Sequence, residues 1–558
     1  MSKVFTAFAI SPGLALGTLH LCRPDQPART VEHDPDPKRR LTTQLALECD
    51  ALAQLAQRPD LSDSQRTLLD ADRLLLEDPE LHQAIFDAID EGLDADEACL
   101  QIFTEYAKQF EQLDDLHLAH RGRDILCIGE RLARRLSGQG HGLPEHLTED
   151  TLLVVPDMTA GEFIRLPKTH LCGVVLERGN VDDHLAILLR SAGIPTLVMA
   201  DALSRLSELS GLLDADKGQL TLATNGDDLQ LFQATLGQWQ QRREKHLACL
   251  DAPAMTGDGE SIWLGANIGS VEETDKVAQH HLDGIGLLRS EFLYMAEGHW
   301  PDEARQLSLY RAIARKLDGA PLVIRTFDFG ADKVLPGLNL VEANPALGQR
   351  AIRLGLAQPE RLKTQLAAIV RLAMEYPVKL LLPMISLPEE LEGVLSLLDE
   401  VKVELAMNPA LPVGIMVETP AAVLMLDAMA PRLDFASVGT NDLAQYCYAA
   451  DRNNASVSPH YPQLSPALIR LLHQLSRQAK SLDLPLSLCG ELASDPRAIP
   501  LLLAMGLRSF SITPVRSAEL KYQLRQYHQP DGKALLAKAL ACTHKRELYA
   551  LLNDCVSR

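Results

Sequence analysis

The second half of the chain repeats one pattern eight times, in which a short apolar run is followed by a stretch with helical spacing. The strand-like runs are SIWLGANIG (261–269), GIGLLRS (284–290), LVIRTFDFG (322–330), KLLLPMIS (379–386), VGIMVETP (413–420), FASVGTND (435–442), LSLCGE (486–491) and SFSITP (509–514). Strands that alternate with helices form parallel sheets, and eight such units in about 300 residues have the size of a TIM barrel. The sequence therefore predicts a (β/α)8 barrel.

The first half of the chain has a different pattern of apolar residues, which is typical of a small α/β domain interrupted by helices. Residues 4–21 read as two strands around a Ser-Pro-Gly turn, and strand-like runs return at 151–158 and 172–177. From Leu41 to Leu136 apolar residues recur every three or four positions, which predicts amphipathic helices. The predicted boundaries are 1–31 and 141–228 for the α/β domain, 32–140 for the inserted helical domain, 229–255 for a polar linker helix and 256–558 for the barrel.

Composition limits the classes of function that remain. The 558 residues exceed what one hydrophobic core usually uses, and 75 acidic against 54 basic residues give a net charge of −21. That charge opposes non-specific attraction to nucleic acid or anionic membranes and favours a basic protein partner. No run of about 18 apolar residues and no signal-peptide pattern occurs, so we expect a cytoplasmic protein without direct membrane insertion. The ten cysteines lack CxxC pairs, which argues against a disulfide framework or a zinc ribbon.

Polar side chains end most of the predicted barrel strands, where TIM barrels carry their active sites. They are Arg289, Glu291, Arg325, Asp328, Glu418, Asn441, Asp442, Cys489 and Glu491. Guanidinium groups bind phosphate and carboxylate oxygens bidentately, and carboxylates are ligands that Mg²⁺ prefers. This set predicts a ligand that is both anionic and metal-bound, and phosphoenolpyruvate fits that description.

Each of these residues also has a structural interpretation. The two arginines are candidates for ion pairs within the barrel, Asp442 for a helix N-cap, and Cys489 for a small core residue. Their joint placement at strand ends favours a functional site over four separate structural roles.

Six stretches in order along the barrel resemble the successive motifs of Enzyme I of the phosphoenolpyruvate:sugar phosphotransferase system. They are GIGLLRSEFLYM, RTFDFGADKVLP, EANPALGQRAIRL, VGIMVETPAA, VGTNDLAQYCYAADR and LCGELASD. The resemblance implies a phosphoenolpyruvate-protein phosphotransferase with an N-terminal swivelling α/β domain. The implied site residues are Arg289, Arg325, Asn441, Arg452 and Lys333 for the substrate, Glu418 and Asp442 for Mg²⁺, and Cys489 for protonating the enolate as pyruvate forms.

The resemblance also implies a phosphorylated histidine, His184. The family's GGRTSHAAI-like motif aligns with GNVDDHLAIL, at the start of a predicted helix, where free amides and the helix dipole favour a phosphoryl group. Val181, Asp182 and Asp183 stand where the family has Arg, Thr and Ser. Two carboxylates beside the imidazole should favour its protonated form and repel an incoming phosphoryl group.

The helical domain of this family docks a separate histidine-containing phosphocarrier protein. HLAHRGRDILCIGERL aligns with the docking helix, but Leu126 and Cys127 replace its usual Arg-Asp pair, and Gly122 falls in mid-helix at a cost of about 1 kcal/mol. The family resemblance further implies a homodimer formed through the barrel.

Two functions are compatible with the sequence. One is a phosphotransferase that moves the phosphoryl group of phosphoenolpyruvate to His184 and then to the carrier, releasing pyruvate. The other is a regulatory paralogue that binds phosphoenolpyruvate but has an altered or lost relay, which Asp182 and Asp183 would favour. Pyruvate phosphate dikinase and phosphoenolpyruvate synthase share the same modules, yet they need a nucleotide-binding domain for which the chain shows no Gly-rich phosphate loop.

Overall fold

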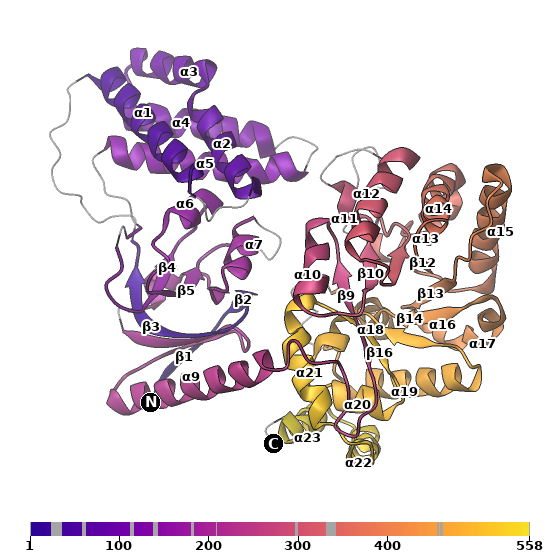
Figure 1. Ribbon diagram of the computed structural model, residues 1–558. Coiled ribbons are helices and arrows are strands. Elements are labelled where there is room, and N and C mark those ends of the chain that lie inside the picture. Colours follow the sequence, from indigo (N-terminus) through magenta and orange to yellow (C-terminus); the bar gives the residue numbers. More distant parts are fainter. Residues whose placement is uncertain are drawn as a thin grey trace. The chain divides into compact units, whose positions relative to one another are not determined.

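The computed structural model describes most of the chain as two compact units, residues 1–241 and 242–558 (Figure 1). The described residues are 2–23, 36–58, 63–111, 116–137, 143–144, 146–179, 184–207, 209–295, 300–330, 342–452, 454, 457 and 461–556. The first unit holds a mixed sheet and a group of helices, and the second holds a closed barrel. The predicted α/β class, with a barrel in the C-terminal half, is confirmed.

One eight-stranded sheet organises the first unit, in the order β1-β8-β7-β3-β4-β5-β6-β2. Its strands are β1 (Lys3–Thr6), β2 (Phe8–Ser11), β3 (Leu14–Leu21), β4 (Thr151–Val155), β5 (Leu171–Leu176), β6 (Thr196–Val198), β7 (Ser210–Asp214) and β8 (Gln219–Leu222). Strands β3 to β6 run parallel to one another, and the other pairings are antiparallel.

The opening segment forms three strands, so the prediction of two strands in residues 4–21 was wrong. Ala7 separates β1, which pairs with β8 at one edge of the sheet, from β2, which pairs with β6 at the other edge. Neighbouring strands lie about 4.8 Å apart, so a single residue cannot cross a flat sheet of this width. The sheet must therefore curl until its two edges meet. Extended backbone continues on both sides of Ala7, and for that reason the apolar pattern did not reveal the switch.

Helices cover both faces of this sheet because alternate strand residues point in opposite directions. The helices are α6 (Ala160–Arg165), α7 (His184–Ser191) and α8 (Ala202–Arg205). Leu153 and Val155 of β4 pack in one cluster with residues of α6 and α7, whereas Leu152 and Val154 pack in another with α8. Helix α7 ends at Ser191, and Gly193, two residues later, adopts a φ of 66° that favours glycine.

The predicted amphipathic helices between the two parts of the sheet are confirmed. They are α1 (Pro37–Ala56), α2 (Asp63–Leu76), α3 (Pro79–Asp90), α4 (Ala95–Glu111) and α5 (Leu116–Leu136). Helices α4 and α5 approach closely at Gly129, where a Cβ atom would lie 2.3 Å from Cβ of Phe103. A side chain at Gly129 would therefore push the two helices apart.

A buried carboxylate ties the helical bundle to the α/β part of the same unit. Glu48 of α1 accepts hydrogen bonds from Arg131 Nε at 3.0 Å and Arg165 Nη1 at 2.8 Å, and Arg135 Nη1 lies 3.3 Å away. Burial alone would raise the pKa of Glu48, but the three guanidinium groups lower it to about 2. Glu48 is therefore charged at neutral pH and links helices α1, α5 and α6.

The second unit is a closed barrel of eight parallel strands, as predicted. Its strands are β9 (Trp263–Ile268), β10 (Ile285–Arg289), β11 (Leu322–Arg325), β12 (Val378–Leu382), β13 (Val413–Val417), β14 (Phe435–Val438), β15 (Leu486–Leu488) and β16 (Ser509–Ile512). Each strand matches one of the eight apolar runs, although most are shorter than the run. The polar residues at the ends of the runs consequently lie at the barrel mouth or in the loops that follow it.

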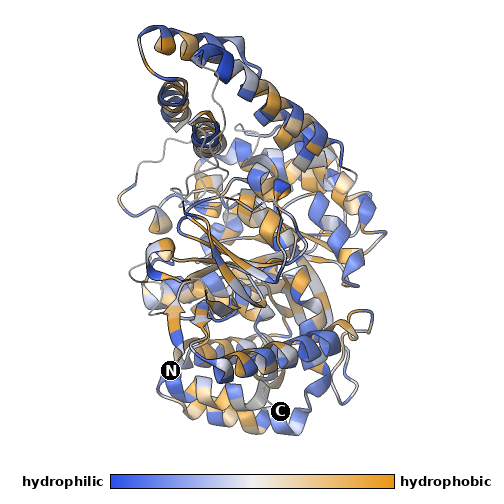
Figure 2. Ribbon diagram, turned by 90° about the vertical axis from the view of Figure 1, so that its left-hand side faces the viewer, coloured by the Kyte–Doolittle hydropathy of each residue, from blue (hydrophilic) through white to orange (hydrophobic). Residues whose placement is uncertain are grey.

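Helices surround the barrel strands (Figure 1). They are α10 (Asp275–Gln279), α11 (Phe292–Met295), α12 (Glu303–Lys316), α13 (Ile352–Ala357), α14 (Pro359–Ala373), α15 (Pro388–Leu405), α16 (Pro420–Leu424), α17 (Leu426–Met429), α18 (Thr440–Tyr448), α19 (Pro466–Ser481), α20 (Ile499–Ala504), α21 (Ser517–Gln526), α22 (Gln529–Ala541) and α23 (Lys545–Val556). Figure 2 shows hydrophobic and hydrophilic residues interleaved along the helices. Within the described part of the chain, none of them is both long and apolar enough to span a bilayer.

Helix α9 (Gly226–Leu247) is long and mostly exposed, and the division between the two units falls inside it. Phe232, near its start, is buried in a cluster with Leu14 and Leu212 of the sheet. Near its end, the ring of His246 lies 5.0 Å from that of Tyr522 in α21. The sequence placed a polar linker helix at 229–255, and the helical part of that segment ends at Leu247.

Candidate active site

The arginines at the strand ends point into the barrel because they continue its inward-facing alternation. The interior below the mouth is packed by Leu287, Val323, Leu381, Met416, Phe435 and Cys489. Arg289, Arg325 and Glu418 each follow one of these inward residues by two positions, so they share its direction. The register of β10 and β11 pairs Arg289 with Arg325 directly. Two cationic side chains therefore stand next to each other at the mouth.

These two arginines differ in the number of carboxylates with which they form ion pairs. Arg325 is buried, and its Nη2 donates to Glu291 Oε1 at 2.5 Å and lies 3.2 Å from Asp328 Oδ2. Burial alone would lower the pKa of Arg325, but Glu291, Asp328 and Glu418 raise it overall. Arg289 is half-buried and forms no ion pair with any residue that the structure describes. Arg325 thus has the structural ion pairs that the sequence allowed, whereas the charge of Arg289 is not paired with any described carboxylate.

Arg350 is a central residue of the mouth that sequence reasoning missed. It is 2% exposed, and its guanidinium binds both oxygens of Asp328, at 2.8 and 3.0 Å. It also donates to both oxygens of Asp442, at 3.0 and 3.3 Å, and to the Tyr446 hydroxyl at 3.1 Å. The available signal was its position in the EANPALGQRAIRL stretch, which lies outside the eight strand-like runs that directed attention to the site.

Glu418 is a buried carboxylate with one oxygen satisfied and one free. Its Oε1 accepts a 2.6 Å hydrogen bond from the backbone N–H of Met384, which adopts a φ of 58°, and its Oε2 has no hydrogen-bond partner among the described residues. Burial, followed by repulsion from Asp442 and Asp328, raises the pKa of Glu418 to about 8. A strained backbone and an unpaired buried oxygen are both typical of sites that await a ligand.

Asp442 completes the acidic group but does not cap its helix. It lies in the first turn of α18, whose N-cap is Gly439, and its carboxylate faces Arg350 and, at 3.6 Å, Nη1 of Arg452. Among the described residues, no group of three or more His, Cys, Asp or Glu is arranged to hold a metal. Glu418 and Asp442 could still hold Mg²⁺, which typically takes one or two protein carboxylates and completes its shell with substrate oxygens and water.

Asn441 is held in a polar network beside the mouth. Its amide nitrogen donates to Glu491 Oε1 at 2.9 Å, while its oxygen accepts from the backbone N–H of Glu491 and from Gln463 Nε2, both at 2.9 Å. Gln463 also donates to the second oxygen of Glu491 at 3.3 Å. Glu491 was placed correctly at the mouth by its strand end, whereas no sequence signal pointed to Gln463.

Cys489 lies at the carboxyl end of β15, inside the barrel and buried. Its thiol donates to the carbonyl oxygen of Val438 at 3.4 Å, and burial raises its pKa to about 11. The thiol therefore stays protonated at neutral pH. The structural interpretation is therefore met, since Cys489 is a small buried residue inside the barrel.

Two of the predicted site residues can be placed only in part or not at all. His184 is the first residue of α7 in the first unit, but its side chain and residues 180–183 lie outside the description. Lys333 also lies outside the described residues. The structure therefore brings together Arg289, Arg325, Glu418, Asn441, Asp442, Arg452 and Cys489 at one barrel mouth.

The chain matches models of known protein families over most of its length. Three family models match the chain, described as "PEP-utilising enzyme, PEP-binding domain" over residues 243–529, "PEP-utilising enzyme, N-terminal" over 6–121 and "PEP-utilising enzyme, mobile domain" over 147–222. The class is thus that of the phosphoenolpyruvate-utilising enzymes.

Similarity to curated proteins shows which family within this class the chain belongs to. The phosphoenolpyruvate-protein phosphotransferase of Staphylococcus carnosus is 32% identical over 88% of this chain and 88% of its own length. That of Priestia megaterium is 30% identical over 99% of each chain. A protein of Escherichia coli strain K12 named "Phosphoenolpyruvate-dependent phosphotransferase system" is 33% identical over 95% of this chain and 72% of its own. The chain belongs to the Enzyme I family of phosphoenolpyruvate-protein phosphotransferases.

Proposed function

We propose that this chain transfers the phosphoryl group of phosphoenolpyruvate to its own His184 and then to a histidine of a separate phosphocarrier protein, releasing pyruvate. The observation that carries this proposal is the buried, protonated thiol of Cys489 beside an arginine-lined mouth. A protein that only bound phosphoenolpyruvate would need the arginines but not an acid.

In the proposed reaction the bridging P–O bond of phosphoenolpyruvate breaks as a P–N bond forms at the imidazole of His184. Arg289, Arg325 and Arg452 bind the phosphate and carboxylate oxygens, assisted by Asn441 and Lys333, and hold the phosphorus in line with the attacking nitrogen. The departing enolate takes a proton at its terminal carbon from the Cys489 thiol, and the thiolate regains a proton from water.

Magnesium would be held by Glu418 and Asp442. When bound, it would neutralise phosphate charge and help to orient the substrate. The unpaired Oε2 of Glu418 supports this assignment, because a buried carboxylate oxygen without a partner is costly unless a cation or donor reaches it. Arg350 now satisfies both oxygens of Asp442, so the arginine must yield part of its contact when an ion binds there.

The relay requires movement between modules. In this proposal the α/β domain of 1–31 and 141–228 carries His184 to the barrel and then to the helical domain of 32–140, where the carrier docks. The linker helix of 229–255 provides the hinge region. The net charge of −21 supports a basic carrier. We further propose a homodimer through the barrel of 256–558 and a cytoplasmic location.

Metal-free protein is expected to lose stability as the pH rises from about 4.5 to about 8, the window set by the ordinary and the raised pKa of Glu418. In this window the folded state binds more protons than the unfolded state, so deprotonation favours unfolding, by roughly 2 to 4 kcal/mol. Scanning calorimetry in EDTA measures the effect. Mg²⁺ should restore stability most at pH 8, and Glu418→Gln should remove both the slope and the restoration. An unchanged slope in the variant would contradict the assignment.

Labelling tests the function itself. Pure protein incubated with Mg²⁺ and phosphoenolpyruvate labelled on phosphorus should acquire about one acid-labile, alkali-stable label per chain and release an equal amount of pyruvate. EDTA should prevent both. If phosphoenolpyruvate binds but leaves no label, the relay is absent and the regulatory alternative is correct.

A further inference from the structure

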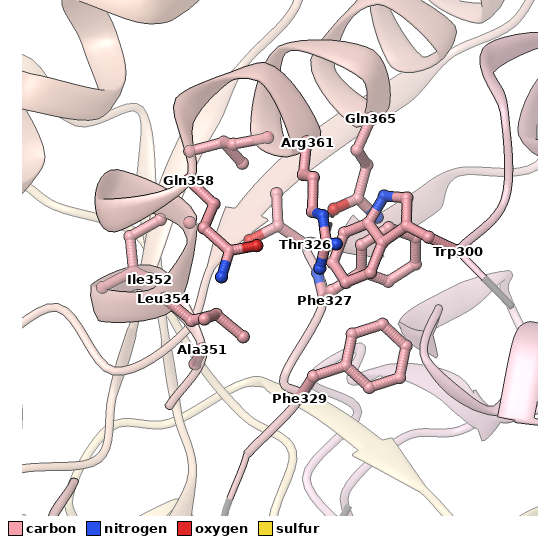
Figure 3. A pocket seen from close by; sticks show the side chains of 12 residues that line it. Trp300, Thr326, Phe327, Phe329, Ala351, Ile352, Leu354, Gln358, Arg361 and Gln365 are labelled. Carbon is pink, nitrogen blue, oxygen red and sulfur yellow. Dashed lines mark hydrogen bonds between the residues drawn. The ribbon is translucent and has the colours of Figure 1, made fainter. Parts of the chain in front are cut away.

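Side chains hold the backbone at several places where a barrel strand ends and its peptide groups leave the sheet. After β11, the N–H of Phe327 donates to Oε1 of Gln365 at 2.9 Å, and Figure 3 shows the Gln365 side chain directed from α14 toward this segment. After β12, the N–H of Met384 donates to Glu418 at 2.6 Å. Buried peptide groups need such partners wherever the sheet no longer supplies them. A further case lies at the end of β15, where Cys489 follows the strand.

The peptide of Cys489 is held from both sides. Strand β15 has only three residues, and its register with β16 consists of the single pair Leu488 and Phe510. Beyond that pair, the N–H of Cys489 donates to the carbonyl of Val438 in β14 at 3.0 Å. Its carbonyl oxygen accepts from Nδ2 of Asn267 at 3.0 Å. A side chain therefore binds the carbonyl on the side where the pairing of strands is shortest.

Asn267 reaches this carbonyl through the barrel interior. It lies on β9, and β16 stands between β9 and β15 in the barrel. Ala266 and Ile268, on either side of it, pack in the cluster shared with the outer helices, whereas Asn267 pairs in register with Leu287, which fills the interior. Its Nδ2 also donates to the carbonyl of Ser511 in β16 at 3.1 Å. One amide thus links β9 to β16 and to the end of β15.

These two contacts fix the orientation of the Asn267 amide. Both hydrogens of Nδ2 are used, and rotating the amide by half a turn would place Oδ1 against two carbonyl oxygens. Oδ1 is buried and has no hydrogen-bond partner among the described residues. A buried acceptor without a donor is costly, and such groups in native proteins are often kept for function.

We propose that Asn267 is a positioning residue for the protonation of the enolate. By holding the Cys489 carbonyl, it sets the place of the thiol relative to the terminal carbon of the substrate. The thiol is a weak hydrogen-bond donor, and its own contact with the Val438 carbonyl, at 3.4 Å, holds Sγ only loosely. The backbone therefore determines where Sγ lies. The inference rests on the proposed function, in which Cys489 gives its proton to that carbon.

Replacing Asn267 by leucine, which is similar in size, removes both donors. In single-turnover quench-flow, the rate of label uptake by His184 should stay close to that of wild type. Pyruvate formation should slow roughly 10- to 100-fold, because a displacement of about 1 Å from the reactive geometry can cost 100-fold in rate. In a Cys489→Ala background, Asn267→Leu should slow pyruvate formation no further, since it acts through the thiol.

The direction of proton delivery provides a readout that a purely structural role would not change. Phosphoenolpyruvate tritiated in one defined position of its terminal carbon, in deuterated water, should give a methyl group of one chirality with wild type. Asn267→Leu should give both chiralities. If the leucine variant does not fold, Asn267→Ala removes the same donors without the bulk of leucine.

Ser511→Ala is the matched control. The Ser511 hydroxyl, which is buried, donates to the carbonyl of Ala266 at 3.0 Å, so it also links β16 to β9 in the barrel interior. Its loss should lower the melting temperature, as the loss of the Asn267 contacts should. The Ser511→Ala protein should nevertheless form pyruvate at the wild-type rate and with one chirality.

Alkylation by iodoacetamide reads the position of Cys489 without relying on activity. Peptide mass spectrometry should show faster modification of Cys489 in Asn267→Leu than in wild type or Ser511→Ala. A wild-type protein that takes up no label and forms no pyruvate would refute the proposed function alone, since faster alkylation in the variant would still support the anchoring of Cys489 by Asn267. A folded variant with an undiminished rate and one chirality, equal slowing in the Cys489→Ala background, or unchanged alkylation would each overturn the positioning role.

Discussion

Replacing His184 by alanine is expected to reduce phosphorylation of the chain by labelled phosphoenolpyruvate from about one group per molecule to none. No other side chain would then form the P–N bond at the start of α7. The barrel is untouched, so phosphoenolpyruvate should still bind with unchanged affinity. Acid-labile label is counted after rapid quenching, and phosphoenolpyruvate binding is measured by calorimetry on the same preparations.

The control for this substitution is His146→Ala, which removes an exposed histidine from the same unit. It should retain full labelling. Equal labelling of His184→Ala and wild type would show that another residue accepts the phosphoryl group. Asp182→Thr with Asp183→Ser places the family's residues beside His184, and this double variant should be labelled faster than the wild-type protein, because two negative charges near the acceptor are removed.

Replacing Cys489 by alanine is expected to slow pyruvate release by roughly 100- to 10,000-fold, the usual contribution of a positioned general acid. Burial raises the thiol pKa to about 11, so the wild-type donor is protonated across the working range of pH. Phosphoenolpyruvate should still bind, because the arginines and carboxylates remain. Single-turnover quench-flow separates label uptake by His184 from the appearance of pyruvate.

Cys447→Ala is the matched control, since Cys447 in α18 is exposed and far less buried than Cys489. It should release pyruvate at the wild-type rate. If the terminal carbon of phosphoenolpyruvate carries tritium in one defined position and the solvent is deuterated water, the positioned thiol should deliver deuterium to one face and give a methyl group of one chirality. The Cys489→Ala enzyme should give both chiralities. Pyruvate formed by the variant at an undiminished rate and on one face only would remove Cys489 from the mechanism.

The sequence correctly predicted the features that depend only on neighbouring residues in the chain. The eight apolar runs located the eight strands, and Arg289, Arg325 and Glu418, which end three of these runs, lie at the barrel mouth. Cys489 directly follows Leu488, the one buried residue of β15, and is itself buried among the residues that fill the barrel interior. Motif resemblance then supplied the expected chemistry, including residues such as His184 and Lys333 whose side chains the structure does not describe.

Contacts between residues that are far apart in the sequence could not be predicted from local patterns. Arg350 meets Asp442, 92 positions away, and Asp328, 22 positions away, only because the barrel closes and brings their loops to one mouth. Ala7 sends β1 and β2 to opposite edges of one sheet, although the local pattern on either side of it is the same. The periodicity of apolar residues shows which face of a helix or strand is buried, because each position on that face is apolar whichever residue it packs against. Pairing depends on packing between distant elements, so tertiary structure alone determined which charges meet at the barrel mouth.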